Sequence, residues 1–176
     1  MVYDCGNNIL IRDLAQPDAK IITDEEIAQG WHQTIEKYEM RLQHQKEGRA
    51  ICLVAEYNGA VAGYINVYPD TDCGPFAGRG YPEIIDFGVL EKYRRHGIGT
   101  RLMDAAEQIA ARYSDTVFLA VGLHSGYGSA QRMYVKRGYV PDGSGVWYQG
   151  KVCPPYDSSC ENDDDLVLFM SKKLHS

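Results

Sequence analysis

A strand, a basic turn with two glycines and a helix follow one another in the middle of the chain. Glu83 to Leu90 is rich in apolar residues and predicts a strand, whereas Ile98 to Tyr113 has the apolar spacing of an amphipathic helix. Thr116 to Val121 then predicts a second strand. Strands joined by a helix usually lie parallel, with a right-handed crossover. The segment therefore restricts the chain to the α/β class.

The flanking segments predict a mixed sheet with helices packed on it. Asn58-Gly59 joins two β-rich runs and favours the type I′ turn of a hairpin. Thr23 and Glu26 match a capping box, and the apolar spacing after them predicts one long helix from about Glu25 to Gln45. The other expected elements are strands at Ile9–Leu14, Ile51–Tyr57, Ala60–Tyr68, Val146–Tyr148 and Leu166–Lys172, and a helix at Ser129–Arg137.

Length and charge narrow the classes of function. The 176 residues predict a single domain, residues 1–176. The formal net charge of -6 gives no electrostatic reason to bind nucleic acid or an anionic membrane. No apolar run is long enough to span a bilayer, and the first residues lack the pattern of a secretory signal, so we expect a cytoplasmic protein.

The cysteines favour no cross-linked or metal-bound framework. They are odd in number and include no CxxC pair, so we expect reduced thiols and neither a disulfide framework nor a metal site. The five positions are Cys5, Cys52, Cys73, Cys153 and Cys160.

The basic turn has the chemistry of an anion site. Free N–H groups at a helix start point out of its first turn, and glycines at Gly97 and Gly99 let a ligand approach the backbone. A pyrophosphate is the expected anion, although neither the P-loop pattern nor the dinucleotide fingerprint matches. The alternative is that the glycines only shape a tight turn and that Arg94 and Arg95 are solvated charges.

Two motifs together resemble one family. Arg94-x-x-Gly97-x-Gly99, between a strand and a helix, is similar to the acetyl-coenzyme A motif of the GNAT superfamily of N-acetyltransferases, and the run 130–139, with Tyr134 near its middle, resembles the second signature of that superfamily. The resemblance implies a GNAT fold, with a mixed, mostly antiparallel sheet of six to seven strands, a splayed parallel pair and three to four helices. The chain departs from the family pattern at His96 and Tyr127.

The resemblance also implies roles for residues. The backbone N–H of Val89 would donate a hydrogen bond to the oxyanion, and Tyr134 would protonate the leaving thiolate. Glu83, eleven residues before Arg94, is the preferred base, with Asp86 or a water relay left open. The residues expected to bind acetyl-coenzyme A are Val89, Arg94, Arg95, His96, Gly97, Ile98, Gly99 and Thr100.

The expected reaction is direct attack of a primary amine on the thioester of acetyl-coenzyme A, with no metal. Because the chain is acidic, we expect a small cationic amine as acceptor. Gly150 to Asp165, which carries several carboxylates, is then either a lid or a solvated connector. A protein or ribosomal N-terminal acetyltransferase, a coenzyme A binding module without catalysis and a homodimeric assembly are left open. His124 follows a strand that borders the cleft in this family.

Overall fold

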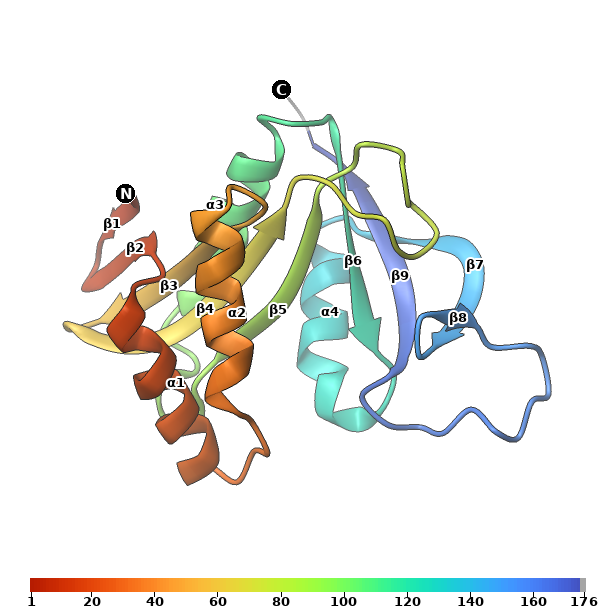
Figure 1. Cartoon of the computed structure of the whole chain (residues 1–176), viewed down its shortest axis with the longest axis horizontal. Coiled ribbons are helices and arrows are strands. Elements are labelled where there is room, and N and C mark those ends of the chain that lie inside the picture. The colour runs from red at the N-terminus through yellow and green to blue at the C-terminus, as the bar shows by residue number, and fades with distance from the viewer. Residues whose placement is uncertain (175–176) are drawn as a thin grey trace. The chain divides into compact units, whose positions relative to one another are not determined.

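The computed structural model describes residues 1–174 and divides the chain into two compact units (Figure 1). Unit 1 consists of Met1–Tyr68 and Ile84–Ile109, and unit 2 consists of Pro69–Glu83 and the chain from Ala110 onward. Each unit combines strands with at least one helix, so the predicted α/β class is confirmed.

Unit 1 is built on neighbouring strands that follow one another in chain order. The hairpin expected around Asn58-Gly59 is confirmed, because both turn residues have positive φ values, 51° and 81°, as a type I′ turn requires. Ile51 pairs with Val67 at the open end of this hairpin. The strands are β1 (Val2–Gly6), β2 (Ile9–Asp13), β3 (Ile51–Tyr57), β4 (Ala60–Tyr68) and β5 (Glu83–Val89).

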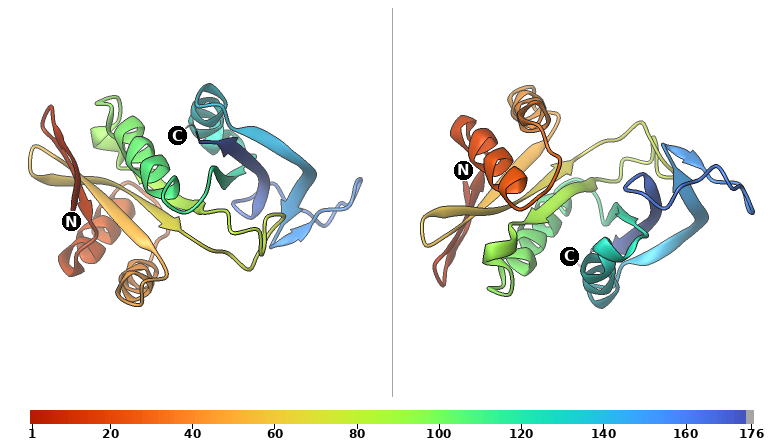
Figure 2. Two further views of the ribbon diagram at one scale, coloured as in Figure 1. Left: turned by 90° about the horizontal axis from the view of Figure 1, so that it is seen from above. Right: turned by 90° about the horizontal axis from the view of Figure 1, so that it is seen from below.

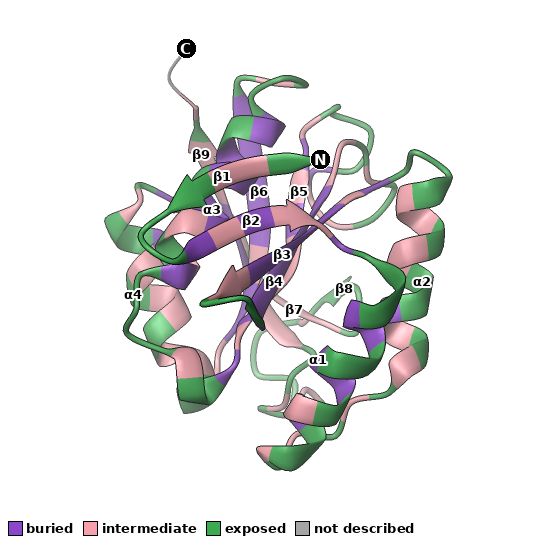
Figure 3. Ribbon diagram, turned by 90° about the vertical axis from the view of Figure 1, so that its left-hand side faces the viewer, coloured by how far each residue is buried: buried purple, intermediate pink, exposed green. Residues whose placement is uncertain are grey.

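Three helices cover the two faces of these strands. Helices α1 (Gln16–Ala28) and α2 (Ile35–Lys46) lie on one face, and α3 (Ile98–Ala110) lies on the other (Figure 2). Beneath α1 and α2, the buried side chains of β3 and β4 form a core that includes Tyr38 and Tyr64. Figure 3 shows β4 buried along most of its length and β3 buried through its middle. This burial on both faces explains why their sequences are nearly uninterrupted apolar runs.

The single long helix expected from Glu25 to Gln45 is wrong. Helix α1 ends near Gly30, whose φ of 88° is left-handed, and Trp31 N–H closes the helix end by donating to Glu26 O at 2.8 Å. Thr23 is not a cap, because its hydroxyl donates to Ala19 O inside the helix. The helix instead begins at Gln16.

Unit 2 contains the remaining strands, in the spatial order β6, β9, β7, β8. Strand β6 (Thr116–Gly122) pairs antiparallel with β9 (Leu166–Lys173), which in turn pairs with β7 (Val140–Tyr148). β8 (Lys151–Val152) extends this edge, and α4 (Gly128–Lys136) is the helix of the unit. Phe76, Phe118 and Phe169 form its buried aromatic cluster.

The strand count predicted from the sequence is wrong. Residues 1–174 contain nine strands rather than six or seven, while the four α-helices agree with the prediction. The short strands β1 and β8 lie at edges and contain no buried residue, so they have little of the apolar signal that reveals a strand. Within the described chain, no helix combines the length and apolarity that a membrane crossing needs.

Candidate active site

The basic turn between β5 and α3 uses its two glycines for different purposes. Gly97 has a φ of 79°, and a Cβ atom there would meet nothing within 4 Å, so its backbone conformation, not crowding, favours glycine. A Cβ on Gly99 would lie 3.1 Å from the ring of Phe87, so Gly99 allows α3 to approach β5 closely. Arg95 also takes a left-handed φ of 66°, which makes the turn compact.

The start of α3 fits an anionic group. Arg101 N–H donates to Gly97 O at 3.1 Å, which leaves the N–H groups of the preceding residues outside the helical ladder. The first turn carries no acidic side chain, and the residues at 94–97 and 100 are exposed. N–H groups without a helical acceptor, a helix dipole and two arginines suit a pyrophosphate.

The side chains of Arg94 and His96 in the turn contact neighbouring residues of unit 1. Arg94 Nε lies 3.4 Å from Val89 O, and its guanidinium lies 5.9 Å from the ring of Trp31. The His96 ring packs on Tyr57 with a centroid distance of 4.7 Å. The bulk of His96, where the family has a smaller residue, is accommodated by this stacking.

Strand β5 contains an irregularity at Asp86. Its φ of 57° is left-handed, as in a β-bulge, and the buried side chain of Asn66 donates to Ile85 O at 3.3 Å and to Asp86 O at 3.2 Å. The simple alternation of side chains along β5 is therefore interrupted between Glu83 and Val89. Alternation alone does not decide which carboxylate faces a reacting centre.

The backbone at the end of β5 is closely packed on β4. Leu90 N–H donates to Ala62 O at 2.9 Å, and a Cβ on Gly63 would lie 3.4 Å from the Cα of Val89 and 2.7 Å from the carbonyl oxygen of Gly88. Val89 itself is half-buried. This packing fixes the peptide group that the resemblance selects for the oxyanion.

The carboxylate of Asp86 is neutralised inside unit 1. Lys37 Nζ lies 2.6 Å from Asp86 Oδ1, and Arg41 Nε lies 3.6 Å from Asp86 Oδ2. All three side chains are largely buried, with 22% or less of each exposed. Asp86 is thus committed to two cations, which argues against the alternative that it acts as the base.

Glu26 is a second carboxylate inside unit 1. Glu26 is fully buried and accepts hydrogen bonds of 2.5 Å from the hydroxyls of Tyr38 and Tyr64. Burial is the main reason that the pKa values of both tyrosines are raised. Their hydroxyls therefore remain donors throughout the physiological range.

Tyr134 is a buried residue of α4. Its side chain is 6% exposed and contacts Tyr139, with ring centroids 5.8 Å apart. Desolvation, and secondarily the proximity of Tyr127, raises the pKa of Tyr134 above its ordinary value of 10. Tyr134 is therefore protonated at neutral pH, and its raised pKa makes it a weaker acid than an ordinary tyrosine.

The sequence-predicted site residues are divided between the units. Val89 and the turn 94–100 belong to unit 1, whereas Tyr134 and Glu83 belong to unit 2. Glu83 is the half-buried first residue of β5. The joint action of the two groups stays a prediction.

A polar cluster at the start of α4 was not recognised from the sequence. Asp164 Oδ1 lies 2.9 Å from His124 Nε2 and accepts the hydroxyl of Tyr127 at 2.9 Å. Gly126 N–H donates to His124 Nδ1, so both ring nitrogens of His124 are engaged. Tyr127, where many family members carry Asn, packs against Gly122, because a Cβ there would lie 2.3 Å from its ring. A separation of 40 residues hid the contact with Asp164.

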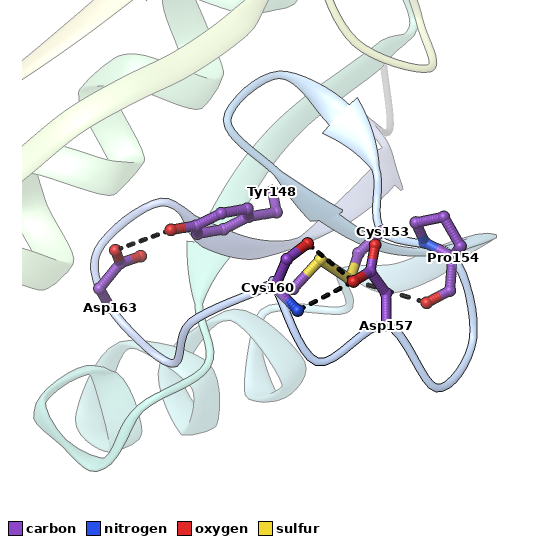
Figure 4. Close-up of a disulfide and its surroundings, with 7 residues drawn as sticks. Tyr148, Cys153, Pro154, Asp157, Cys160 and Asp163 are labelled. Atoms are coloured by element: carbon purple, nitrogen blue, oxygen red, sulfur yellow. Dashed lines mark hydrogen bonds between the residues drawn. A yellow bond between two sulfur atoms is a disulfide. The ribbon is translucent and has the colours of Figure 1, made fainter.

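The expectation that all cysteines are reduced thiols is wrong. Cys153 and Cys160 form a disulfide that closes part of the segment from Gly150 to Asp165 (Figure 4). Their spacing of seven residues matches no common motif, so only the fold of the loop reveals the pair. Cys5, Cys52 and Cys73 are free thiols, and burial raises the pKa of Cys52 to about 12.

Another contact fixes the same segment. The Tyr148 hydroxyl donates to Asp163 Oδ2 at 3.3 Å, near the disulfide (Figure 4). Asp163 and Asp164 therefore bind neighbouring side chains. Glu161, Asp164 and Asp165 lie exposed. The described residues hold no cluster of three or more side chains suited to a metal ion.

Comparisons with known proteins agree on one family. The sequence pattern of the acetyltransferase (GNAT) family matches residues 13–139. No curated protein matches the chain significantly. Three similar solved structures are Ard1 from Thermoplasma volcanium, an acetyltransferase from Salmonella typhimurium that modifies the N-terminal serine of a 50S ribosomal subunit protein, and YncA, a putative acetyltransferase from Salmonella typhimurium with its cofactor acetyl-CoA.

These structures share the fold at low sequence identity. Ard1 has a TM-score of 0.68 at 20% identity, with 96% of this chain and 99% of that chain covered. The ribosomal-protein acetyltransferase has a TM-score of 0.72 at 10% identity, with 99% of this chain and 100% of that chain covered. YncA has a TM-score of 0.66 at 19% identity, with 96% of this chain and 95% of that chain covered. The GNAT fold expected from the two motifs is confirmed. The family pattern covers most of the sequence, and the chain therefore belongs to the GNAT family of acetyltransferases.

Proposed function

We propose that this acetyltransferase transfers the acetyl group of acetyl-coenzyme A to the primary amine of a small cationic molecule by direct attack. The observation that carries the proposal is the open turn at residues 94–100, with its left-handed Gly97 and a helix start free of acidic side chains. Acetyl-coenzyme A supplies an activated thioester and a pyrophosphate to bind. The match of the family pattern to segments of both units supports their action as a single domain, residues 1–176.

The chain's own residues supply the binding and proton steps. The N–H groups of the turn hold the pyrophosphate, and the N–H of Val89 donates to the developing oxyanion. Tyr134 donates its proton to the leaving sulfur, and Glu83 accepts the proton of the incoming ammonium, directly or through water. Asp86 is the weaker candidate for the base because Lys37 and Arg41 already neutralise it.

The charge of the chain supports a cationic acceptor. A net charge of -6 attracts ammonium groups, and Glu161 and Asp165 are exposed on the loop that the disulfide constrains. We propose this loop as a specificity element. Changing Glu161 to Gln and Asp165 to Asn tests the charge and spares the hydrogen bonds of Asp163 and Asp164, so KM for the acceptor should rise while kcat stays.

A second candidate is acetylation of protein N-termini. One of the structurally similar acetyltransferases from Salmonella typhimurium modifies the N-terminal serine of a ribosomal subunit protein. This similarity supports a protein N-terminus as the alternative acceptor. An assay of coenzyme A release over polyamines, amino acids, aminoglycosides and N-terminal peptides separates the two. A peptide preferred over every small amine would reject the small-molecule proposal. A cytoplasmic location and a homodimeric assembly stay predictions.

Cofactor binding is tested separately from turnover. Acetyl-coenzyme A should raise the melting temperature by ligand linkage, and ATP and NAD should raise it much less. Equal stabilisation by ATP would reject the assignment of the turn to coenzyme A. Release of coenzyme A without any amine would instead point to hydrolysis or to self-modification.

A further inference from the structure

One lysine of the chain is held with its amine against the strand that carries Val89. Lys37 lies in the first turn of α2, and its Nζ lies 2.6 Å from the carboxylate of Asp86. The same nitrogen lies 5.1 Å and 5.5 Å from the ring centroids of Tyr38 and Tyr64, and 3.4 Å from Gln33 Oε1. A carboxylate and two aromatic faces therefore surround this amine.

Three other ion-paired lysines differ from Lys37 in exposure. The Lys37 side chain is 22% exposed, whereas those of Lys20, Lys92 and Lys173 are 72%, 52% and 67% exposed. Lys20 and Lys92 pair with carboxylates at 2.5 Å and 2.6 Å, so pairing alone does not distinguish Lys37. Its distinction is a fixed place in the interior of unit 1.

The surroundings of Lys37 are tied to residues 86–89 of β5. Asp86 is the left-handed residue of this stretch. Tyr64 lies directly on Gly88, since a Cβ there would be 2.7 Å from both Cζ and Oη of the tyrosine. Gly88 precedes Val89, whose N–H the proposed function assigns to the acetyl carbonyl. The amine thus contacts this strand directly at Asp86, and Tyr64 connects it to Gly88 of the same strand.

The charges around Asp86 tolerate the loss of the Lys37 charge. Asp86 Oδ1 lies 2.6 Å from Lys37 Nζ. Arg41 Nε lies 3.6 Å from the other oxygen, so the carboxylate keeps one cationic neighbour after Lys37 becomes neutral. A buried carboxylate left without any cation would be costly, and this arrangement avoids that state.

We propose that Lys37 is a self-acetylation site, modified by the chain's own bound acetyl-coenzyme A when no acceptor is present; this inference rests on the proposed function. The Lys37 ammonium gives one proton to water, and the neutral nitrogen forms a bond to the acetyl carbon as the carbon–sulfur bond breaks. A second proton leaves the nitrogen and ends on the coenzyme A sulfur. The product is a neutral amide that no longer pairs with Asp86.

The test is peptide mass spectrometry of the full chain after incubation with acetyl-coenzyme A alone. Burial protects Lys37 from reagents in bulk solution, so uncatalysed acetylation should favour Lys20 and Lys92. We expect Lys37 to gain an acetyl group at least about tenfold faster than either, because a fixed amine reacts with a high effective concentration. The rate constant should not change on dilution of the protein, as an intramolecular reaction requires.

Two variants serve as controls. Lys37→Arg keeps a cation beside Asp86 and should remove the modification without loss of acetyl-coenzyme A affinity. Gly97→Val should abolish the modification by weakening cofactor binding, which calorimetry measures independently. Circular dichroism confirms that both variants fold.

The outcomes separate this inference from the proposed function. If acetyl-coenzyme A binds and an added amine is acetylated, but Lys37 reacts no faster than Lys20, self-acetylation is wrong and the proposed function stands. If acetyl-coenzyme A fails to bind, both are wrong. A first-order rate constant that falls in proportion to protein concentration would also overturn the inference, since transfer would then occur between molecules.

Discussion

The ring of Tyr64 occupies the space beside Gly88 that the side chain of any other residue would need. A Cβ atom at Gly88 would lie 2.7 Å from both Cζ and Oη of the tyrosine. This contact connects the buried pair Tyr38 and Tyr64 to the end of β5, one residue before Val89. The position of the proposed oxyanion donor thus depends on a side chain that has no part in the chemistry.

Gly88→Ala should destabilise the protein by about 1–3 kcal/mol, the range for overpacking a core. Gly128→Ala is the matched control, because Gly128 has an ordinary φ of -56° and nothing lies within 4 Å of a Cβ there. Urea unfolding measures both. In a Tyr64→Leu background the cost of Gly88→Ala should fall, and an unchanged cost would show that this contact is not its cause.

Gly97→Val should weaken acetyl-coenzyme A binding, because a branched side chain strains the left-handed turn and projects into the space above it. Gly97→Asn should fold with less loss of stability, since Asn tolerates positive φ better than Val. Calorimetric titration gives the affinity, and thermal unfolding gives the stability. Full affinity in Gly97→Val would remove the turn from the cofactor site.

Tyr134→Phe should lower kcat by about a hundred- to ten-thousandfold, the range for loss of a general acid. Because burial raises the pKa of Tyr134, the hydroxyl stays protonated beyond the ordinary value of 10. The alkaline limb of the kcat profile below that pH should therefore not come from Tyr134. Tyr139→Phe, which changes the neighbouring ring in the same way, should retain turnover; an equal loss in both variants would argue for a packing effect.

Acid should weaken unit 2 through Asp164. Hydrogen bonds from His124 and then Tyr127 hold the pKa of this carboxyl below its ordinary value of 3.8. Its contribution to stability is therefore present above about pH 4 and is lost as the pH falls through the lower folded value. The side chain is 78% exposed, so the effect should be below about 1 kcal/mol and should shrink in salt. Asp164→Asn should reduce the loss of stability between pH 5 and pH 3 in urea unfolding.

Reduction of the Cys153–Cys160 disulfide should lower stability by about 2–3 kcal/mol, the chain-entropy value for so short a loop. Denaturant unfolding with and without a dithiol reductant measures the change. The Cys153→Ser/Cys160→Ser variant should behave like the reduced protein and should not respond to the reductant. A response of the double variant would assign the effect to another part of the chain.

Local patterns in the sequence were reliable where the structure is local. The Asn58-Gly59 turn depends on the φ preferences of its own two residues, and α3 depends on apolar spacing after Gly97. Both could be predicted for that reason. The break between α1 and α2 is also local, but the helical spacing of apolar residues continued across Gly30 and concealed it.

The contacts that the sequence could not reveal join distant segments. Asp86 meets Lys37 only because α2 packs over β5, and Asp164 meets His124 only because the loop before β9 returns to α4. Each partner alone resembles an ordinary surface charge. The disulfide required the loop itself to bring two cysteines together.

The bond between Cys153 and Cys160 turns the segment from 153 to 160 into a covalent ring, and Tyr156 within it is fully exposed. A protease that cuts one peptide bond inside this ring would not release a fragment, because the two cut ends remain joined through sulfur. The two pieces would separate only after reduction. A cut beside the exposed Tyr156 would thus leave β8 and β9 linked in one molecule through the disulfide.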